Sequence, residues 1–397
     1  MSAATIDTLL VVFVAAALTP IVARWLKDVP VPAVVLEIGA GILIGPAVLG
    51  LANQDPVTED LANFGLSMLI FLAGFEVDPA RIRGRPLRLA SGGWLFSLVV
   101  GLGVGMLLAR SGDVSALVVG LALTTTALGT LLPILRDAGV LGEKFGTHAL
   151  AIGTVGEFAP IVSIALLLTG DNPVNTTLLL LAFVVVTFVV AFLASRPKSP
   201  TAMRFLGESL HSTGQLPVRL AVLILVALIW LTLEFGLDVL LGAFAAGMVI
   251  RLASTGEQAN ELTSRLESIG FGFFIPIFFV MTGVTFDIAG LLADPLNLLL
   301  LPLFLSLFFL VRGLPILFYR SEVERNDLIP LALVSATALP LVVVITEIGV
   351  STGRMNSGLA TALVGAGMVS VILFPAVALR LRARSRRTPP ADTVAPP

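Results

Sequence analysis

Long apolar segments recur along this 397-residue chain, and they constrain its fold more than any other feature. A helix needs about 20 apolar residues to cross the hydrocarbon core of a bilayer. Hydrophobic residues make up 57% of the chain and charged residues only 13%, whereas a soluble domain has about 25% charged residues. The sequence therefore predicts an all-α polytopic membrane protein with thirteen transmembrane helices. The expected spans lie near 5–26, 33–51, 60–76, 88–109, 114–136, 146–169, 174–195, 217–234, 237–253, 267–287, 296–319, 328–348 and 355–380.

The positions of the basic residues test this count and predict an orientation. If the N-terminus lies outside, the cytoplasmic loops and tail hold 21 of the 24 Lys and Arg residues. The outer loops then hold Arg110 and Arg354, and Arg312 lies within a span. The positive-inside rule favours this arrangement. We therefore expect a multi-pass protein of the cell membrane with its N-terminus outside and its C-terminus in the cytoplasm.

Three pairs of stretches in the two halves of the chain resemble each other in order. IGAGILIG (38–45) pairs with LGAFAAGMVI (241–250), FLAGFEVD (71–78) with FVMTGVTFD (279–287), and TALGTLLPILRDAGV (126–140) with TALPLVVVITEIGV (337–350). Six spans on each side of a lone seventh place the second set in the opposite orientation, as in secondary transporters built from inverted repeats. A generic bundle with coincidental similarity is the alternative.

This repeat predicts the domain organisation. We expect one transmembrane domain over 1–382, with repeat one at 5–169, a linker helix at 174–195 and repeat two at 217–380. The basic, Pro-rich segment 383–397 is expected to be a short disordered cytoplasmic tail.

Polar residues together with Gly or Pro interrupt two spans that the repeat relates. The fifth span contains LTTTALGTLLP (123–133) and the twelfth contains VSATALPLVV (334–343). If the helices break there, half-helix ends, carbonyls and hydroxyls reach the middle of the membrane, where their oxygens suit a hard monovalent cation. Alternatively, the hydroxyls bond to the preceding turn and the prolines only kink the helices. The residues expected at these breaks are Thr125, Thr126, Gly129, Pro133, Thr337 and Pro340.

One carboxylate lies in the middle of the sixth span, in LAIGTVGEFAPIVSIALLL (150–168). This residue is Glu157. An ionised side chain at the membrane centre costs about 2.5 kcal/mol or more, so intramembrane acids usually mark functional sites. The depth of Glu157 matches that of the two breaks, and Thr154 lies one turn earlier on the same face. Glu157 is therefore predicted to hold a proton or a cation, unless it only forms an interhelical hydrogen bond.

Arg312, in FFLVRGLPI, is the only basic residue inside a span. Unless its side chain reaches the interface, it needs an acidic partner or backbone carbonyls, and Glu157 or Glu76 could supply the acid. Glu76 and Asp78, at the end of the third span, either line a cytoplasmic funnel or balance the neighbouring basic loop.

Several kinds of site are missing from the sequence. The chain has no cysteine, its two histidines are far apart, and it contains no nucleophile triad, metal-ligand cluster or phosphate-binding loop. We therefore expect no enzyme, no bound cofactor and no nucleic-acid partner.

Five motifs, in order along nearly the whole membrane region, resemble those of the monovalent cation:proton antiporter family, in its Kef-type and sodium/proton exchanger branch. They are LEIGAGILIGPAVLG (36–50), MLIFLAGFEVDP (68–79), LLPILRDAGVLGEKFG (131–146), LGAFAAGMVI (241–250) and FFIPIFFVMTGVTFDI (273–288). The resemblance implies a homodimer with scaffold helices at its interface. It also implies a core domain that contains two crossed discontinuous helices and moves like an elevator.

The resemblance also implies roles for individual residues. Glu157 takes the second, ion-binding position of the acidic pair of the family, and Arg312 resembles the basic residue of the span before the second broken helix. The pair is usually Asp-Asp, Asn-Asp or Gln-Asp, whereas here it is Gly156-Glu157. Because electrogenic members use two acids, a single acid implies electroneutral exchange of one cation per proton.

The expected function is the exchange of Na⁺ or K⁺ for protons by alternating access. Glu157 would bind the metal ion and the proton in turn, and Arg312 and Glu76 would balance charge. A symporter or organic-anion carrier on a related inverted-repeat fold is one alternative. A non-transporting membrane sensor, in which Glu157 has only a structural role, is another.

Overall fold

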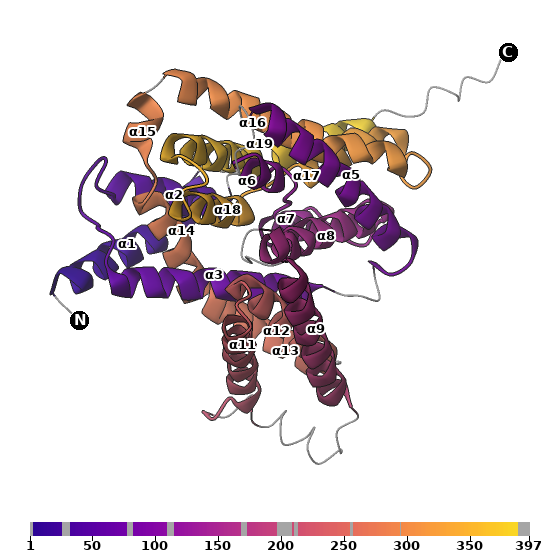
Figure 1. Ribbon diagram of the computed structural model, residues 1–397, viewed down its shortest axis with the longest axis horizontal. Helices are drawn as coiled ribbons and strands as arrows, with labels where there is room; N and C mark the ends of the chain where they lie inside the picture. Colours follow the sequence, from indigo (N-terminus) through magenta and orange to yellow (C-terminus); the bar gives the residue numbers. More distant parts are fainter. Residues whose placement is uncertain are drawn as a thin grey trace. The chain divides into compact units, whose positions relative to one another are not determined.

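The computed structural model describes residues 3–25, 32–77, 82–108, 115–167, 173–196, 209, 213–254, 257–293 and 295–387 (Figure 1). All the regular elements in these ranges are helices. Ten of the described helices are long and apolar enough to cross a membrane, and two shorter apolar helices, α2 (Ala33–Ile44) and α12 (Val239–Ala253), accompany them. The chain is therefore an all-α, multi-pass membrane protein, as the sequence predicts.

Each expected span coincides with one helix or with consecutive helices. Besides α2 and α12, the single helices are α1 (Ala3–Trp25), α3 (Pro56–Glu76), α5 (Arg85–Leu108), α8 (Lys144–Leu167), α9 (Pro173–Ser195), α11 (Leu216–Glu234) and α19 (Ser357–Arg387). The other spans are composed of α6 (Ser115–Ala122) and α7 (Leu128–Asp137); α13 (Glu257–Ile269), η1 (Gly270–Phe274) and α14 (Ile275–Val284); α16 (Pro295–Gly313) and η2 (Leu314–Tyr319); and α17 (Leu328–Ser335) and α18 (Pro340–Ser351). Two short elements, α15 (Ile288–Ala293) and η3 (Arg325–Asp327), lie between spans.

The last helix extends beyond the expected transmembrane domain. Helix α19 continues to Arg387, so residues 383–387 are helical, although they were expected to begin a disordered tail. The remaining residues of the expected tail, 388–397, lie outside the described part of the chain.

The chain divides into two compact units. Unit 1 contains Met1–Arg81 and Phe158–Ile288, and unit 2 contains Ile82–Glu157 and Ala289–Pro397. Each unit takes segments from both expected repeats, and the division passes through α8 directly after Glu157.

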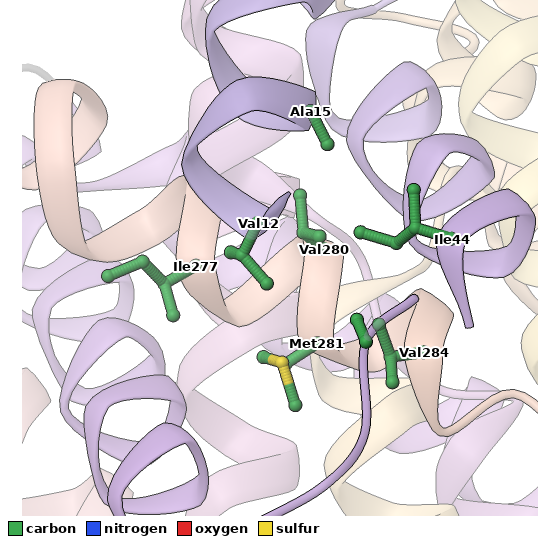
Figure 2. Packing of buried hydrophobic residues seen from close by; sticks show 8 residues of the cluster. Val12, Ala15, Ile44, Ile277, Val280, Met281 and Val284 are labelled. Carbon is green, nitrogen blue, oxygen red and sulfur yellow. The ribbon is translucent and has the colours of Figure 1, made fainter. Parts of the chain in front are cut away.

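Close helix packing holds unit 1 together. Helix α14 packs against α2 and α3, and α12 packs against α3 and α11. Gly41 of α2 and Gly283 of α14 allow one such approach, because a Cβ at either position would collide with the backbone of the other helix. Figure 2 shows the apolar cluster that α1, α2 and α14 form around this contact. Its labelled members are Val12, Ala15, Ile44, Ile277, Val280, Met281 and Val284.

Unit 2 holds the two discontinuous spans between continuous helices. Helix α5 packs against α6, and α19 packs against α16, α17 and α18. Near the end of α19, the buried Arg382 pairs with Glu143 and with Asp327, whose Oδ1 lies 2.7 Å from its Nε. The Arg382 guanidinium also lies 4.1 Å from the centroid of the Phe145 ring. This cluster fastens α19 to η3 and to the start of α8.

Candidate functional site

Two helices of unit 2 are interrupted where the sequence predicts. Residues 123–127 separate α6 from α7, and residues 336–339 separate α17 from α18. At the end of α6, the hydroxyls of Thr124 and Thr125 donate to the carbonyls of Leu121 (2.7 Å) and Ala122 (2.9 Å), which turns the chain out of the helix. Pro340 starts α18 at a position where its missing N–H leaves no partner unsatisfied.

The two breaks are hydrogen-bonded to each other. The Ala127 N–H donates to the Thr337 carbonyl over 2.8 Å, and Thr126 Oγ1 donates to the Ser335 carbonyl over 2.6 Å. Backbone groups that lose their partners in one helix thus find new partners in the other.

Ser370 of α19 completes the second break. It accepts from the Ala338 N–H and lies 3.0 Å from the Ala338 carbonyl. Ser370 had no counterpart among the predicted site residues, and its only signal is a lone hydroxyl in the apolar stretch GMVSVIL.

Glu157 lies against the start of α7. Its side chain is buried, with only 1% of the residue exposed. It accepts hydrogen bonds from the backbone N–H groups of Leu128 and Gly129, in the first turn of α7. The Thr126 N–H donates to the Gly156 carbonyl over 2.9 Å, so the break is also fixed to the turn of α8 that carries Glu157.

The Glu157 carboxylate keeps one oxygen free. Oε2 is buried and has no hydrogen-bond partner among the described residues. The N-terminus of a helix stabilises a negative charge through its N–H groups and dipole. The site thus consists of a carboxylate with one oxygen held by a helix end and the other available to a proton or a cation.

Arg312 is buried in the same unit, with 4% of the residue exposed. Its Nε and Nη2 donate to Thr126 Oγ1 over 3.0 and 2.8 Å. The carbonyls of Ser335 (3.4 Å) and Ile152 (3.5 Å) lie at longer distances. No carboxylate in the described part of the chain forms an ion pair with Arg312, so a hydroxyl and carbonyls hold it instead of Glu157 or Glu76.

Gly156 is the reason that Arg312 can approach α8 so closely. A Cβ at this position would lie 2.6 Å from Arg312 Nη2 and 2.6 Å from Thr126 Oγ1. The guanidinium and the threonine therefore fill the space that a side chain at residue 156 would need.

The remaining predicted residues are placed as follows. The Thr125 hydroxyl bonds to the preceding turn, as described, and so does that of Thr337, which donates to the Leu333 carbonyl over 3.2 Å. Thr154 is buried one turn before Glu157. Glu76 is the last residue of α3 in unit 1, and it is partly exposed.

Two of the predicted residues lie wholly or partly outside the described part of the chain. Pro133 lies within α7, but its side chain is outside the described part, and Asp78 is outside it entirely. No cluster of three or more His, Asp or Glu residues suited to a metal ion occurs in the described residues.

An intramembrane acid beside two discontinuous helices is typical of secondary transporters. The comparison with known protein families agrees: the model described as "Sodium/hydrogen exchanger, transmembrane" matches residues 12–379. The chain belongs to this family, which confirms the family expected from the motifs. It is a family of transporters and not of enzymes.

Curated relatives share about a quarter to a third of their residues with the chain. The putative Na⁺/H⁺ antiporter YjbQ of Bacillus subtilis is 27% identical, over 99% of this chain and 66% of its own length. The Na⁺/H⁺-K⁺ antiporter GerN of Bacillus cereus is 30% identical over 65% of this chain and 67% of its own. The probable Na⁺/H⁺ antiporter 3 of Methanocaldococcus jannaschii is 27% identical, over 92% of this chain and 95% of its own length. The chain spans about two thirds of the length of the two Bacillus relatives.

Among solved structures, the fold is similar to that of MjNhaP1, the sodium proton antiporter of Methanocaldococcus jannaschii at pH 8. The TM-score is 0.67 with 16% sequence identity, and the match covers 96% of this chain and 97% of that one. The two chains therefore share a fold over nearly their whole length.

Proposed function

We propose that this chain is a secondary transporter that exchanges Na⁺ or K⁺ for protons at Glu157. The observation that carries the proposal is the buried carboxylate whose Oε2 lacks a partner, beside the start of α7. The family supports an antiporter, and the names of YjbQ and GerN support Na⁺ or K⁺ as its ions.

Coupling follows from competition for one carboxylate. An ionised carboxylate without a counter-charge is costly in a low-dielectric interior, by several kcal/mol. The two N–H groups of α7 offset part of that cost, and a bound proton or cation offsets the rest. The carrier then crosses its barrier loaded with one or the other, and exchange is obligatory.

The cation needs further oxygen ligands around Glu157. The hydroxyls of Thr125 and Thr337 donate their protons to carbonyls, which leaves lone pairs on their oxygens. Thr126 Oγ1 donates to Ser335 and accepts twice from Arg312, so it has no lone pair left for a cation. Thr154 adds a hydroxyl on the same helix as Glu157. We assign Thr125, Thr154, Thr337 and nearby carbonyls to the cation site, because hydroxyl and carbonyl oxygens suit hard monovalent cations. Thr126, which was also predicted there, holds Arg312 instead.

We assign Arg312 the role of a fixed positive charge that holds the first break through Thr126. Since Gly156 supplies no acid, only one carboxylate is available to each transported ion. We therefore propose electroneutral exchange of one cation for one proton.

The transport cycle requires movement of the site between the two membrane faces. We propose thirteen spans in two inverted repeats, N-terminus outside and C-terminus in the cytoplasm of a cell-membrane protein. Unit 2 corresponds to the moving core, because it contains both discontinuous helices and Glu157. The resemblance to the family supports elevator-type movement within a homodimer, with the discontinuous helices crossing where Ala127 meets Thr337.

Flux measurements in proteoliposomes test the assignment of Glu157. The Glu157→Gln variant keeps the size of the side chain but cannot exchange a charge, so cation-driven dequenching of an internal pH dye should disappear. Glu157→Asp is the matched control, because it keeps the carboxylate and should retain measurable exchange with a changed cation affinity.

Undiminished exchange by Glu157→Gln in folded protein would overturn the assignment. The stoichiometry is tested in the same vesicles by clamping the membrane potential with valinomycin and K⁺. A one-for-one exchanger should show the same Na⁺-driven rate at zero and at negative potential, whereas a rate that changes with the potential would contradict electroneutral exchange.

A further inference from the structure

A small cavity lies beside Arg312 within unit 2. Trp94, Arg312, Tyr319 and Ser335 supply its polar walls, and the other lining residues are apolar. The volume within this cavity that the centre of a water-sized molecule can occupy is ≈ 10 Å³. That is about the space that a single buried water needs.

Two aromatic residues of this cavity carry polar atoms without partners. Trp94 Nε1 and Tyr319 Oη are both buried and have no hydrogen-bond partner in the described chain. The residues themselves are only 5% and 1% exposed. Leaving such a group unpaired in the interior is costly, so two of them around one cavity indicate a polar occupant.

Arg312 contributes a third group. Thr126 accepts from its Nε and Nη2, whereas Nη1 makes only a long contact of 3.5 Å with Ser97 Oγ in the described part of the chain. A guanidinium has five N–H donors, so Arg312 retains donors beyond those that Thr126 takes.

We propose that the cavity is a hydration site that holds one water molecule. The water accepts hydrogen bonds from Trp94 Nε1 and from Arg312, and it donates one to Tyr319 Oη. Buried waters typically make about three hydrogen bonds to groups that lack other partners. The positive charge of Arg312 would also attract an anion, which is therefore the rival occupant.

Polar groups connect this site with the surface of unit 2. The ring of Tyr319 packs edge-on against His148, with centroids 5.5 Å apart. His148 Nε2 lies 3.9 Å from Glu322 Oε2, and Glu322 pairs with Arg85 over 2.6 Å. The side chain of Arg85 is 64% exposed.

The water would give Arg312 a polar environment on the cavity side, where no carboxylate is present. Arg312 then stays charged in the interior because water and Thr126 Oγ1 together solvate it. This inference concerns Arg312 alone and does not depend on which ion Glu157 carries.

Hydroxyl-radical labelling by X-ray radiolysis tests the site, because radicals form from water and label side chains in contact with it. The full chain is irradiated in detergent and analysed by mass spectrometry. After correction for intrinsic reactivity, Trp94 and Tyr319 should be labelled about fivefold faster than Phe145 and Phe183, which are buried aromatic residues outside the cavity lining. Labelling of all four at one low rate would overturn the proposal.

Variants show whether the label comes from a shared water. Tyr319→Phe removes only the hydroxyl and should lower labelling of Trp94 about threefold, because the water loses a partner. Trp230→Phe, at an exposed indole, is the matched control and should leave Trp94 unchanged. If Tyr319→Phe does not fold, Trp94→Phe gives the reciprocal measurement at Tyr319, which is the only tyrosine of the chain.

Two further outcomes decide between water and its rivals. Bromide also scavenges hydroxyl radicals, so labelling of Trp94 is compared with that of the exposed Trp230 at each bromide concentration. If bromide protects Trp94 more than Trp230, the site binds an anion and the water proposal is wrong. If Tyr319→Phe raises the melting temperature, the hydroxyl had no partner, and the proposal is again wrong. A lower melting temperature supports the water.

Discussion

At the scale of single residues, the missing side chain at position 156 decides how the site is organised. Arg312 and Thr126 occupy the space beside Gly156, within 2.6 Å of where a Cβ would be. An acid at this position would collide with the same two groups. Because residue 156 is glycine, it adds no second carboxylate beside Glu157, and it leaves room for the guanidinium of Arg312.

Gly156→Ala is expected to impair exchange strongly. The added methyl group must displace Arg312 from Thr126, and Thr126 in turn holds the break. We expect a loss of stability of about 1–3 kcal/mol and a drop of at least about tenfold in exchange rate. Thermal melting of the purified chain and flux in proteoliposomes measure the two effects.

A second glycine provides the control for this prediction. A Cβ at Gly92 of α5 would meet nothing within 4 Å, so Gly92→Ala should leave both quantities nearly unchanged. If Gly156→Ala exchanged ions at the wild-type rate, the contact of Arg312 with Thr126 would not be needed for exchange, and the prediction would be wrong.

At the scale of elements, the hydroxyl of Thr126 joins the two discontinuous helices and the arginine. It accepts from Arg312 and donates to the Ser335 carbonyl. The neighbouring hydroxyl of Thr124 bonds only within its own turn, to the Leu121 carbonyl. Thr124 and Thr126, two residues apart in the same break, thus differ in whether they join helices or only end one.

Thr126→Val should therefore be far more damaging than Thr124→Val, although both residues are buried. The first substitution leaves a buried guanidinium and a carbonyl without their shared partner, at a cost of about 1–3 kcal/mol or more. Hydrogen–deuterium exchange over 123–128 and 335–340 should rise in Thr126→Val and stay near wild type in Thr124→Val. Equal protection in both variants would contradict a joining role for Thr126.

The sequence predicts these elements well, because each polar residue is conspicuous in an apolar span. Glu157, the threonine-rich break and Pro340 could all be recognised in this way. The hydrogen-bond partner of Arg312 could not be recognised from the sequence. Thr126 lies 186 positions away from Arg312, and its hydroxyl is only one of several at the two breaks. The self-satisfied hydroxyls of Thr125 and Thr337 show that both alternatives considered for the threonines occur side by side.

Packing into units was also beyond the reach of sequence pattern. The repeats expected at 5–169 and 217–380 do not by themselves say which helices pack together, and the contacts group parts of both repeats in each unit. Each helix presents apolar residues to several neighbours, so hydropathy alone does not select which helices pack.

At the scale of the whole molecule, ion binding should be visible as stability. A cation that binds only the folded chain stabilises it, by about 1.4 kcal/mol at ten times its dissociation constant. Na⁺ or K⁺ should therefore raise the melting temperature of the wild-type chain, whereas Glu157→Gln should not respond. Choline chloride at equal ionic strength is the control.

This stabilisation should depend on pH with a definite sign. The cation needs the ionised carboxylate, and protons compete for it, so the shift in melting temperature should shrink as the pH falls. A shift that is the same in acid and in alkali would mean that the cation binds away from Glu157.

The bond between Ala127 and Thr337 has a consequence for the origin of such a protein. Neither half of the chain contains both breaks, so neither half alone could satisfy the backbone groups that its own break exposes. An ancestor of half the present length would have needed a second copy of itself to supply this bond. Fusion of two such genes would then have placed in one chain the two backbone groups that hydrogen-bond to each other, the Ala127 N–H and the Thr337 carbonyl.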